Sequence, residues 1–173
     1  MKRWISAAAL GALAAVCLAP PALAADRVSG VLTATFVIVD NTDLIGDVRC
    51  DVANNTPCFS FGVPDVELRL NGFTITGKGD AVTGCGGATS TPVEAGIITN
   101  GVSRVGVRGP GLVQRFRGDG VFVVGSTDAR VEDLTVATNC LSGIRVAGTA
   151  FGTVIQNNTA VRNGSPTASC GGI

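Results

Sequence analysis

The chain has 173 residues, of which 46% are hydrophobic and 15% charged, and it contains no histidine and no tyrosine. Thirteen basic residues balance thirteen acidic ones, which argues against a nucleic-acid partner because such binding depends on a basic surface. A chain of this length is sufficient for one domain with a buried core, and without histidine it has no imidazole base or imidazole metal ligand.

Residues 1–24 are predicted to be a signal peptide. Two basic residues open the segment, an apolar run follows from Ile5 to Leu18, and an Ala-x-Ala cleavage pattern ends at Ala24. The run is shorter than a membrane-spanning helix requires, so we expect no membrane span and a secreted or periplasmic chain that starts at Ala25. The alternative, a lipid anchor on Cys17, fits less well because the preceding valine is larger than the residue usually found there.

Residues 25–57 are predicted to form an N-terminal strand and cap region. Val28 to Asp40 is rich in β-branched residues, which favour strands. We expect this stretch to cover the first end of the structure, because an exposed strand edge needs protection. The polar loop that follows lies between Cys50 and Cys58, and in an exported chain this spacing favours a disulfide that closes the loop.

Residues 58–173 are predicted to be a repeat array. The phrase Gly96-Ile97-Ile98-Thr99 returns in similar form at Gly120 and Gly143 and begins again at Gly172, and a period between about 20 and 50 residues is typical of solenoids. Each period contains short strand-forming runs separated by small polar turns. We therefore expect an all-β fold of about four or five three-sided coils whose strands pair in parallel.

Two other architectures share some of these features. Leucine-rich repeats have a similar period but need a Leu-x-x-Leu-x-Leu framework, which the sequence lacks. A β-sandwich also uses many short strands, but it does not require the same phrase at the same spacing. Both architectures therefore account for the pattern less well than a parallel coil.

Three segments, Leu70–Gly77, Arg130–Val136 and Val154–Thr159, resemble the coils of the right-handed parallel β-helix repeat proteins of the pectin-lyase-like superfamily. The resemblance covers residues 58–173. It implies a right-handed parallel β-helix, or solenoid, in an exported and carbohydrate-facing role. No specific enzyme subfamily is matched, since the Gly-His-Gly element of its polygalacturonases cannot be present without histidine.

The last repeat begins at Gly172 and the sequence ends at Ile173. We therefore expect the β-helix to be incomplete at its C-terminus. The segment is then either a piece of a longer protein or a chain whose open coil associates with a second copy, because an open strand edge pairs readily with neighbours.

The remaining cysteines can be placed on the repeats. Cys140 and Cys170 each come shortly before a repeat glycine, so stacking of the repeats predicts a disulfide between them. Cys85 is then left without a partner.

Alternation along the first strand of each repeat predicts which side chains face outward. One outward column contains Ile98, Phe122 and Arg145, in which Phe122 is a candidate apolar platform for a sugar ring and Arg145 a candidate charged contact. The plainer interpretation is the ordinary exposure of apolar atoms at a protein surface.

Four further arginines, Arg104, Arg108, Arg115 and Arg117, are concentrated in one repeat. Arginine binds carboxylates in a fork, which makes an anionic polysaccharide a candidate partner and these residues candidate contacts. The plainer interpretation is a solvated outer face.

Acidic residues lie in or beside the turns of the next repeat. Asp119, Asp128 and Asp133 are the candidate catalytic acids. Asp128, Glu132 and Asp133 are the candidate ligands for Ca²⁺, because hard cations bind clustered oxygens, and no other cofactor is expected. The plainer interpretation is that aspartate fills turns because its side chain bonds the local backbone.

Together these features favour an exported β-helix module with a polysaccharide-binding or structural role. Cleavage of a glycosidic bond ordinarily needs two carboxyls that face the bond, and the predicted outward columns of the first strand contain none, so we expect no catalysis in this segment. The alternatives are a polysaccharide lyase or glycoside hydrolase that acts on an acidic polysaccharide, and a surface adhesin or assembly component.

Overall fold

The computed structural model describes residues 25–85, 91, 93–165 and 172–173. The signal-peptide prediction for residues 1–24 and the predicted disulfide partner Cys170 lie outside these ranges. Within them the chain forms thirteen strands and no helix, which confirms the all-β prediction. In the described segments there is accordingly no helix of the length and apolarity needed to cross a membrane.

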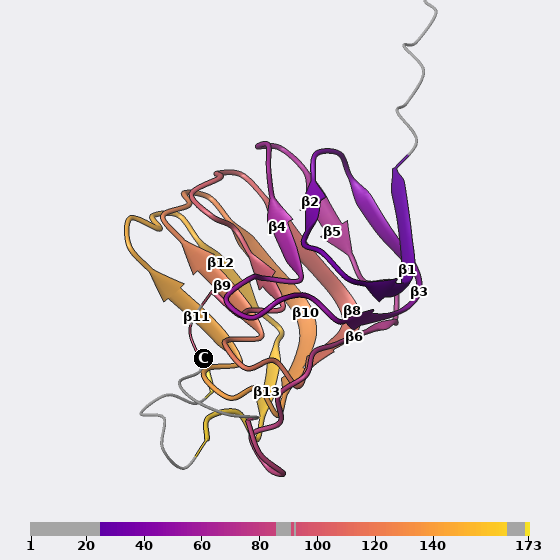
Figure 1. Ribbon diagram of the computed structural model, residues 1–173. Coiled ribbons are helices and arrows are strands. Elements are labelled where there is room, and N and C mark those ends of the chain that lie inside the picture. The colour runs from indigo at the N-terminus through magenta and orange to yellow at the C-terminus, as the bar shows by residue number, and fades with distance from the viewer. Residues whose placement is uncertain (1–24, 86–90, 92, 166–171) are drawn as a thin grey trace, which may run out of the picture.

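The strands form two sheets in which every pair is parallel (Figure 1). Sheet A contains eight strands, which are β1 (Asp26–Leu32), β3 (Thr42–Cys50), β5 (Glu67–Arg69), β6 (Thr74–Thr76), β8 (Gly106–Gln114), β10 (Arg130–Ala137), β12 (Val154–Gln156) and β13 (Thr159–Val161). Sheet B contains five, which are β2 (Phe36–Ile38), β4 (Phe59–Phe61), β7 (Ile97–Ile98), β9 (Val121–Val124) and β11 (Ile144–Ala147). The chain alternates between the sheets, and its circuits stack from the indigo β1 end to the yellow β13 end (Figure 1). This arrangement is compatible with a β-helix-like solenoid.

The glycine-led phrases stack on one another, as the repeat predicted. Ile97 pairs with Val121, which in turn pairs with Ile144. The N–H of Ile97 donates to the carbonyl of Gly120 at 3.1 Å, and the N–H of Val121 donates to the carbonyl of Gly143 at 2.9 Å. The same segment of each repeat therefore forms one rung of sheet B.

The core lies between the two sheets and is built from columns of β-branched and aliphatic side chains. In sheet A the column contains Leu68, Val107 and Val131, and all three are at most 1% exposed. Ile97 and Val121 continue the packing from sheet B and are fully buried. Because each such side chain contributes about 1.5–3 kcal/mol on burial, the Val and Ile content of the repeats stabilises the stack.

The second and third predicted strands of a repeat are joined in two of the circuits. β8 and β10 each span both predicted runs, with a bend between them instead of a turn. In β10 the pairing register shifts between Glu132 and Leu134, where Asp133 has a left-handed φ of 60°. Asp133 lies opposite two residues of β8, Gly109 and Pro110. One extra residue in one of two paired strands bends that strand without ending its ladder, which the spacing of polar residues did not indicate.

The first strands occupy one end of the stack. β1 is the outermost strand of sheet A and β2 the outermost strand of sheet B. Both pair in parallel with the strand of the next circuit. The strand-rich stretch before residue 41 therefore lies at the edge of both sheets.

One disulfide prediction is confirmed and the other is wrong. Cys50 is bonded to Cys58, but Cys140 is bonded to Cys85 and not to Cys170. The loop after β6 runs along the stack, and the N–H of Ala81 donates to the carbonyl of Thr138 at 2.9 Å. This route brings Cys85 to the buried Cys140, and the repeat spacing carries no information about it.

Candidate functional site

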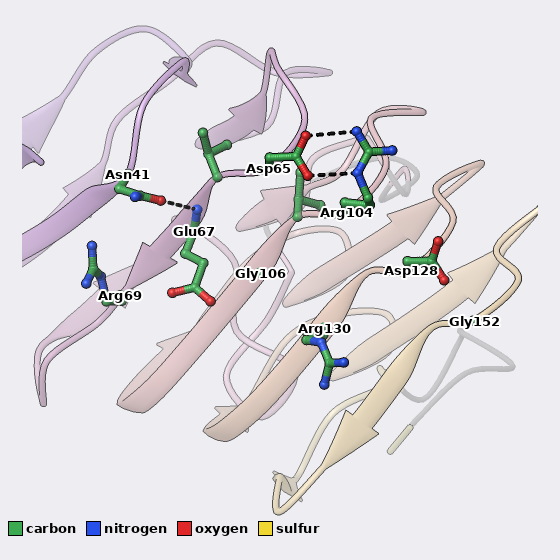
Figure 2. Close-up of a pocket in the computed structure, with 11 residues that line it drawn as sticks. Asn41, Asp65, Glu67, Arg69, Arg104, Gly106, Asp128, Arg130 and Gly152 are labelled. Atoms are coloured by element: carbon green, nitrogen blue, oxygen red, sulfur yellow. Dashed lines mark hydrogen bonds and ion pairs between the residues drawn. The ribbon is translucent and has the colours of Figure 1, made fainter. Parts of the chain in front are cut away.

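A groove of about 540 Å³ lies beside the starts of β5, β8 and β10 (Figure 2). Its lining residues come from successive circuits and are Asn41, Asp65, Val66, Glu67, Arg69, Arg104, Val105, Gly106, Asp128, Arg130 and Gly152. The groove therefore runs along the stacking direction and crosses several circuits of the chain.

Gly106 lies in the middle of the groove. It pairs with Glu67 on one side and with Arg130 on the other, so these three residues occupy equivalent positions on adjacent strands. A Cβ atom at Gly106 would lie 3.0 Å from Cγ of Glu67. The Glu67 side chain therefore lies over Gly106, which is itself buried, and Figure 2 shows Glu67 and Arg130 on either side of this position.

One wall of the groove is formed by residues with a left-handed backbone conformation. They occupy the corner between strands in successive circuits and lie one above another. Asp65, Arg104, Asp128 and Gly152 have φ values of 63°, 54°, 55° and 68°. The N–H of Asp65 donates to the carbonyl of Arg104 at 3.0 Å, so the corner positions lie on one another. Aspartate and glycine adopt this conformation readily, whereas an arginine in it costs of order 1–3 kcal/mol and depends on the surrounding structure.

Arg104 and Asp65 form the strongest polar contact of this wall. Nε and Nη2 of Arg104 donate to the two carboxylate oxygens of Asp65 at 2.7 and 2.8 Å. This forked hydrogen bond lowers the pKa of Asp65 below its usual value and raises the pKa of Arg104. Both side chains are exposed, so the pair orders the wall and contributes little to stability.

The face next to the groove is a network of alternating charges. Nη2 of Arg108 lies 3.5 Å from Glu67 and 3.6 Å from Glu132. Glu132 is 7% exposed, and its Oε1 also lies 3.5 Å from Nη1 of Arg130 and accepts a 3.0 Å hydrogen bond from Gln156. Carboxylates and guanidinium groups therefore neutralise one another from circuit to circuit.

Asp128 differs from the other acids of the groove. It is exposed, and among the described residues no cation lies within ion-pair distance of its carboxylate. Its Oδ1 lies close to Gly152, where a Cβ atom would collide with it. Asp128 is thus a carboxylate with free acceptor capacity at the end of the wall.

The predicted outward column on sheet B exists, but its surface is closed. Ile98 pairs with Phe122, which pairs with Arg145. Ile98 and Phe122 are only 6% and 7% exposed, and the guanidinium carbon of Arg145 lies 5.1 Å from the centre of the Phe122 ring. This ring is therefore packed and capped by a cation instead of lying open to a sugar.

The turn before β9 brings Asp119 next to Arg145. It is fully buried, its Oδ1 accepts a 2.7 Å hydrogen bond from the N–H of Ser142, and its Oδ2 lies 4.0 Å from Nη1 of Arg145. Oδ2 has no hydrogen-bond partner among the described residues. Burial raises the pKa of Asp119, against the lowering effects of the Ser142 N–H and the Arg145 charge.

The remaining candidate arginines do not converge on one site. Nε of Arg115 lies 3.3 Å from Asp80 and Nε of Arg117 lies 3.6 Å from Glu94, while Arg108 belongs to the charged face beside the groove. Each arginine is therefore paired with a carboxylate in its own part of the surface.

The three candidate calcium ligands also occupy different parts of the structure. Glu132 is engaged in the charged network, Asp133 occupies the bend of β10 and is exposed, and Asp128 lines the groove. In the part of the chain that the structure describes, no three acidic, cysteine or histidine side chains gather closely enough to hold a metal ion.

Several groove residues were not among the predicted site residues, notably Glu67, Gly106 and Arg130. Gly106 and Arg130 occupy equivalent positions in consecutive repeats, so an alignment of the repeats could have found them. Glu67 lies before the long loop between β6 and β7, and this insertion hides its equivalence to Gly106.

No family model, curated protein or solved structure matches this chain. The site therefore has to be interpreted from its own geometry.

Proposed function

We propose that this chain is a secreted or periplasmic right-handed parallel β-helix of the pectin-lyase-like type, which binds a polysaccharide in the groove beside β5, β8 and β10. Two disulfides suit an exported protein, and the parallel sheets suit the fold. The proposed role is binding, with no catalytic step.

The observation that carries the proposal is the repetition of polar groups across circuits. Glu67, Gly106 and Arg130 lie on three adjacent strands, and Asp65, Arg104 and Asp128 form the parallel wall. Adjacent strands are about 4.8 Å apart, so the groove presents polar groups at short, regular intervals. A linear polymer of polar units is the kind of ligand that such a row fits.

The size and chemistry of the groove agree with this ligand. A volume of about 540 Å³ falls in the range of about 300–1,000 Å³ that is usual for ligand sites. Charged side chains with free lone pairs and N–H groups bond hydroxyls well.

Binding is favoured over cleavage by the state of the carboxylates. Hydrolysis of a glycosidic bond ordinarily needs one carboxyl as acid and a second as base or nucleophile. In the groove, Asp65 is held by Arg104 and Glu67 lies beside Arg108, so among the residues that the structure describes Asp128 is the acid of the groove without an ion-pair partner. One free carboxylate suits a hydrogen-bond acceptor better than a catalytic pair.

The test is affinity electrophoresis of the purified protein in gels that contain single polysaccharides, followed by calorimetry with those that retard it. We expect retardation by at least one polysaccharide without any fall in its chain length. Gly106→Thr should abolish the retardation because its side chain would displace Glu67 from its position in the groove, whereas Val146→Thr on the exposed face of β11 should not. Retardation that is equal in the two variants contradicts the assignment of the groove, and fragmentation of the polymer supports the lyase or hydrolase alternative.

A further inference from the structure

Resting on the proposed function, we infer that the polysaccharide bound in this groove is uncharged. The ligand class is a neutral, hydroxyl-rich glycan chain, and not the anionic polysaccharide that the concentration of arginines suggests in the sequence.

The groove is electrically balanced. Three carboxylates and three arginines line it, and the signs alternate along the wall from Asp65 to Arg104 to Asp128. An anionic chain would place a carboxylate in every unit or every second unit next to this row. Each favourable contact with an arginine would then be offset by repulsion from the neighbouring acid.

The arginines are also already neutralised. Arg104 is bound by Asp65 at 2.7 Å, Nε of Arg69 lies 3.0 Å from Asp43, and Nη1 of Arg130 lies 3.5 Å from Glu132. A uronate would have to compete with a resident carboxylate at each of them. Sites that recognise carboxylates use guanidinium forks that are free to make both bonds to the ligand.

A cationic chain fits no better. Asp128 is the acid of the groove with no cation at ion-pair distance within the described residues, but it neighbours Arg104, whose pKa it raises by its charge. Arg130 lines the same part of the groove. A chain with an ammonium group on every unit would meet these guanidinium groups as often as it met a carboxylate.

A neutral hydroxyl can form hydrogen bonds to a carboxylate and to a guanidinium group at the same time. A sugar hydroxyl donates one hydrogen bond and accepts others, so it is matched by a carboxylate and a guanidinium at adjacent positions. Arg104 and Asp128 present this pair on adjacent circuits of the wall, and Glu67 and Arg130 add a carboxylate and a guanidinium on either side of Gly106. Charged groups make stronger bonds to neutral partners than uncharged ones do, which provides affinity without a charged ligand.

The experiment compares three polymers by calorimetry: galactomannan, which is neutral, polygalacturonate, which is anionic, and chitosan, which is cationic. We expect galactomannan to bind best, with an affinity that changes by less than about twofold between about 50 and 500 mM NaCl, because screening does not act on a neutral ligand. Glu67→Gln removes one negative charge from the groove. It should weaken galactomannan binding by about fivefold, because Glu67 is one of its hydrogen-bond acceptors, and give polygalacturonate a detectable, salt-sensitive affinity.

Gly106→Thr provides the steric test and should weaken galactomannan binding by about tenfold or more, with Gly106→Ala as a smaller step and circular dichroism as the check on folding. Preferred binding of polygalacturonate or chitosan, weakened by salt, overturns the inference while leaving the proposed function in place. If no glycan in a wider panel binds the wild-type protein, the proposed function itself is wrong.

Discussion

The carbonyl oxygen of Gly120 lies 2.7 Å from the point that a Cβ atom would occupy at Gly96. The same relationship recurs one circuit later, where a Cβ at Gly120 would lie 2.6 Å from the carbonyl oxygen of Gly143. Neither Gly96 nor Gly120 has a positive φ. At Gly96 and Gly120 glycine is therefore required by the close stacking of successive circuits, and not by an unusual backbone conformation.

Gly120→Ala should destabilise the protein by about 2 kcal/mol, because overpacking against a backbone oxygen forces the circuits to shift. Gly106→Ala is the matched control. It also adds one Cβ to a strand glycine, but the nearest atom belongs to the flexible Glu67 side chain, so we expect a change within about 0.5 kcal/mol. Urea unfolding followed by circular dichroism measures both values. Equal destabilisation by the two substitutions would show that the stacking contact is not the cause.

Removal of the Cys85–Cys140 disulfide should cost more stability than removal of the Cys50–Cys58 disulfide. The sequence separations are 55 and 8 residues, and in the chain-entropy account these loops correspond to about 4 and about 2.5 kcal/mol. Paired Cys→Ala variants of each disulfide, unfolded in urea under identical conditions, provide the comparison. Peptide mapping without reduction should identify a linked pair that contains Cys85 and Cys140. A peptide that links Cys140 to Cys170 would contradict the structure.

Asp119→Asn should raise stability at neutral pH. Burial raises the pKa of Asp119 in the folded state, so the folded protein binds this proton more tightly than the unfolded chain does. The contribution of Asp119 is therefore most favourable below its unfolded pKa of about 3.9 and is lost as the pH rises through the folded pKa. Asparagine still accepts the Ser142 N–H but carries no charge to bury.

The measurement is the free energy of unfolding of both proteins between about pH 4 and pH 8. The advantage of Asp119→Asn should be largest near pH 8 and shrink toward pH 4. Arg145→Gln is a useful companion, because loss of its positive charge should raise the pKa of Asp119 further and widen the difference from Asp119→Asn at neutral pH. A difference that is constant across the range would mean that Asp119 does not titrate there.

Arg104→Gln should return the pKa of Asp65 toward the usual value for aspartate. The hydrogen bonds from Arg104 are the main cause of its lowered pKa, and glutamine cannot replace the charged fork. Carboxyl-detected NMR titration gives the pKa of each aspartate separately. Asp51, whose pKa is lowered by a hydrogen bond from Lys78 in another part of the surface, is the internal control and should not change. Movement of both residues would indicate a general disturbance of the structure.

Much of the fold could be predicted because its signals are local and repeated. The glycine-led phrase marks where circuits stack, and Ile97, Val121 and Ile144 indeed form one column. The Cys50–Cys58 disulfide could be predicted because its two residues are close in the chain. The pairing of Cys140 could not, because the loop that carries Cys85 has no periodicity from which its path can be inferred.

The site was harder to predict than the fold. The interpretation of Phe122 as a platform followed from its outward position in the strand, but its exposure depends on what covers it, including Arg145 from the next circuit. The grouping of Arg108, Arg115 and Arg117 followed from their proximity in sequence, whereas in the structure each lies beside a different carboxylate.

The sequence by itself determined most of the composition of each rung: β-branched residues for the interior, glycine where circuits touch, and aspartate, asparagine or glycine at many left-handed corners, with Arg104 as an exception. These are properties of single residues and of their spacing. Only the tertiary structure decided which charged side chains meet across circuits, because Glu67, Gly106 and Arg130 belong to separate repeats and one long insertion intervenes. Stacking converts positions far apart in the chain into neighbours about 4.8 Å apart. The groove is formed by side chains that only this stacking brings together.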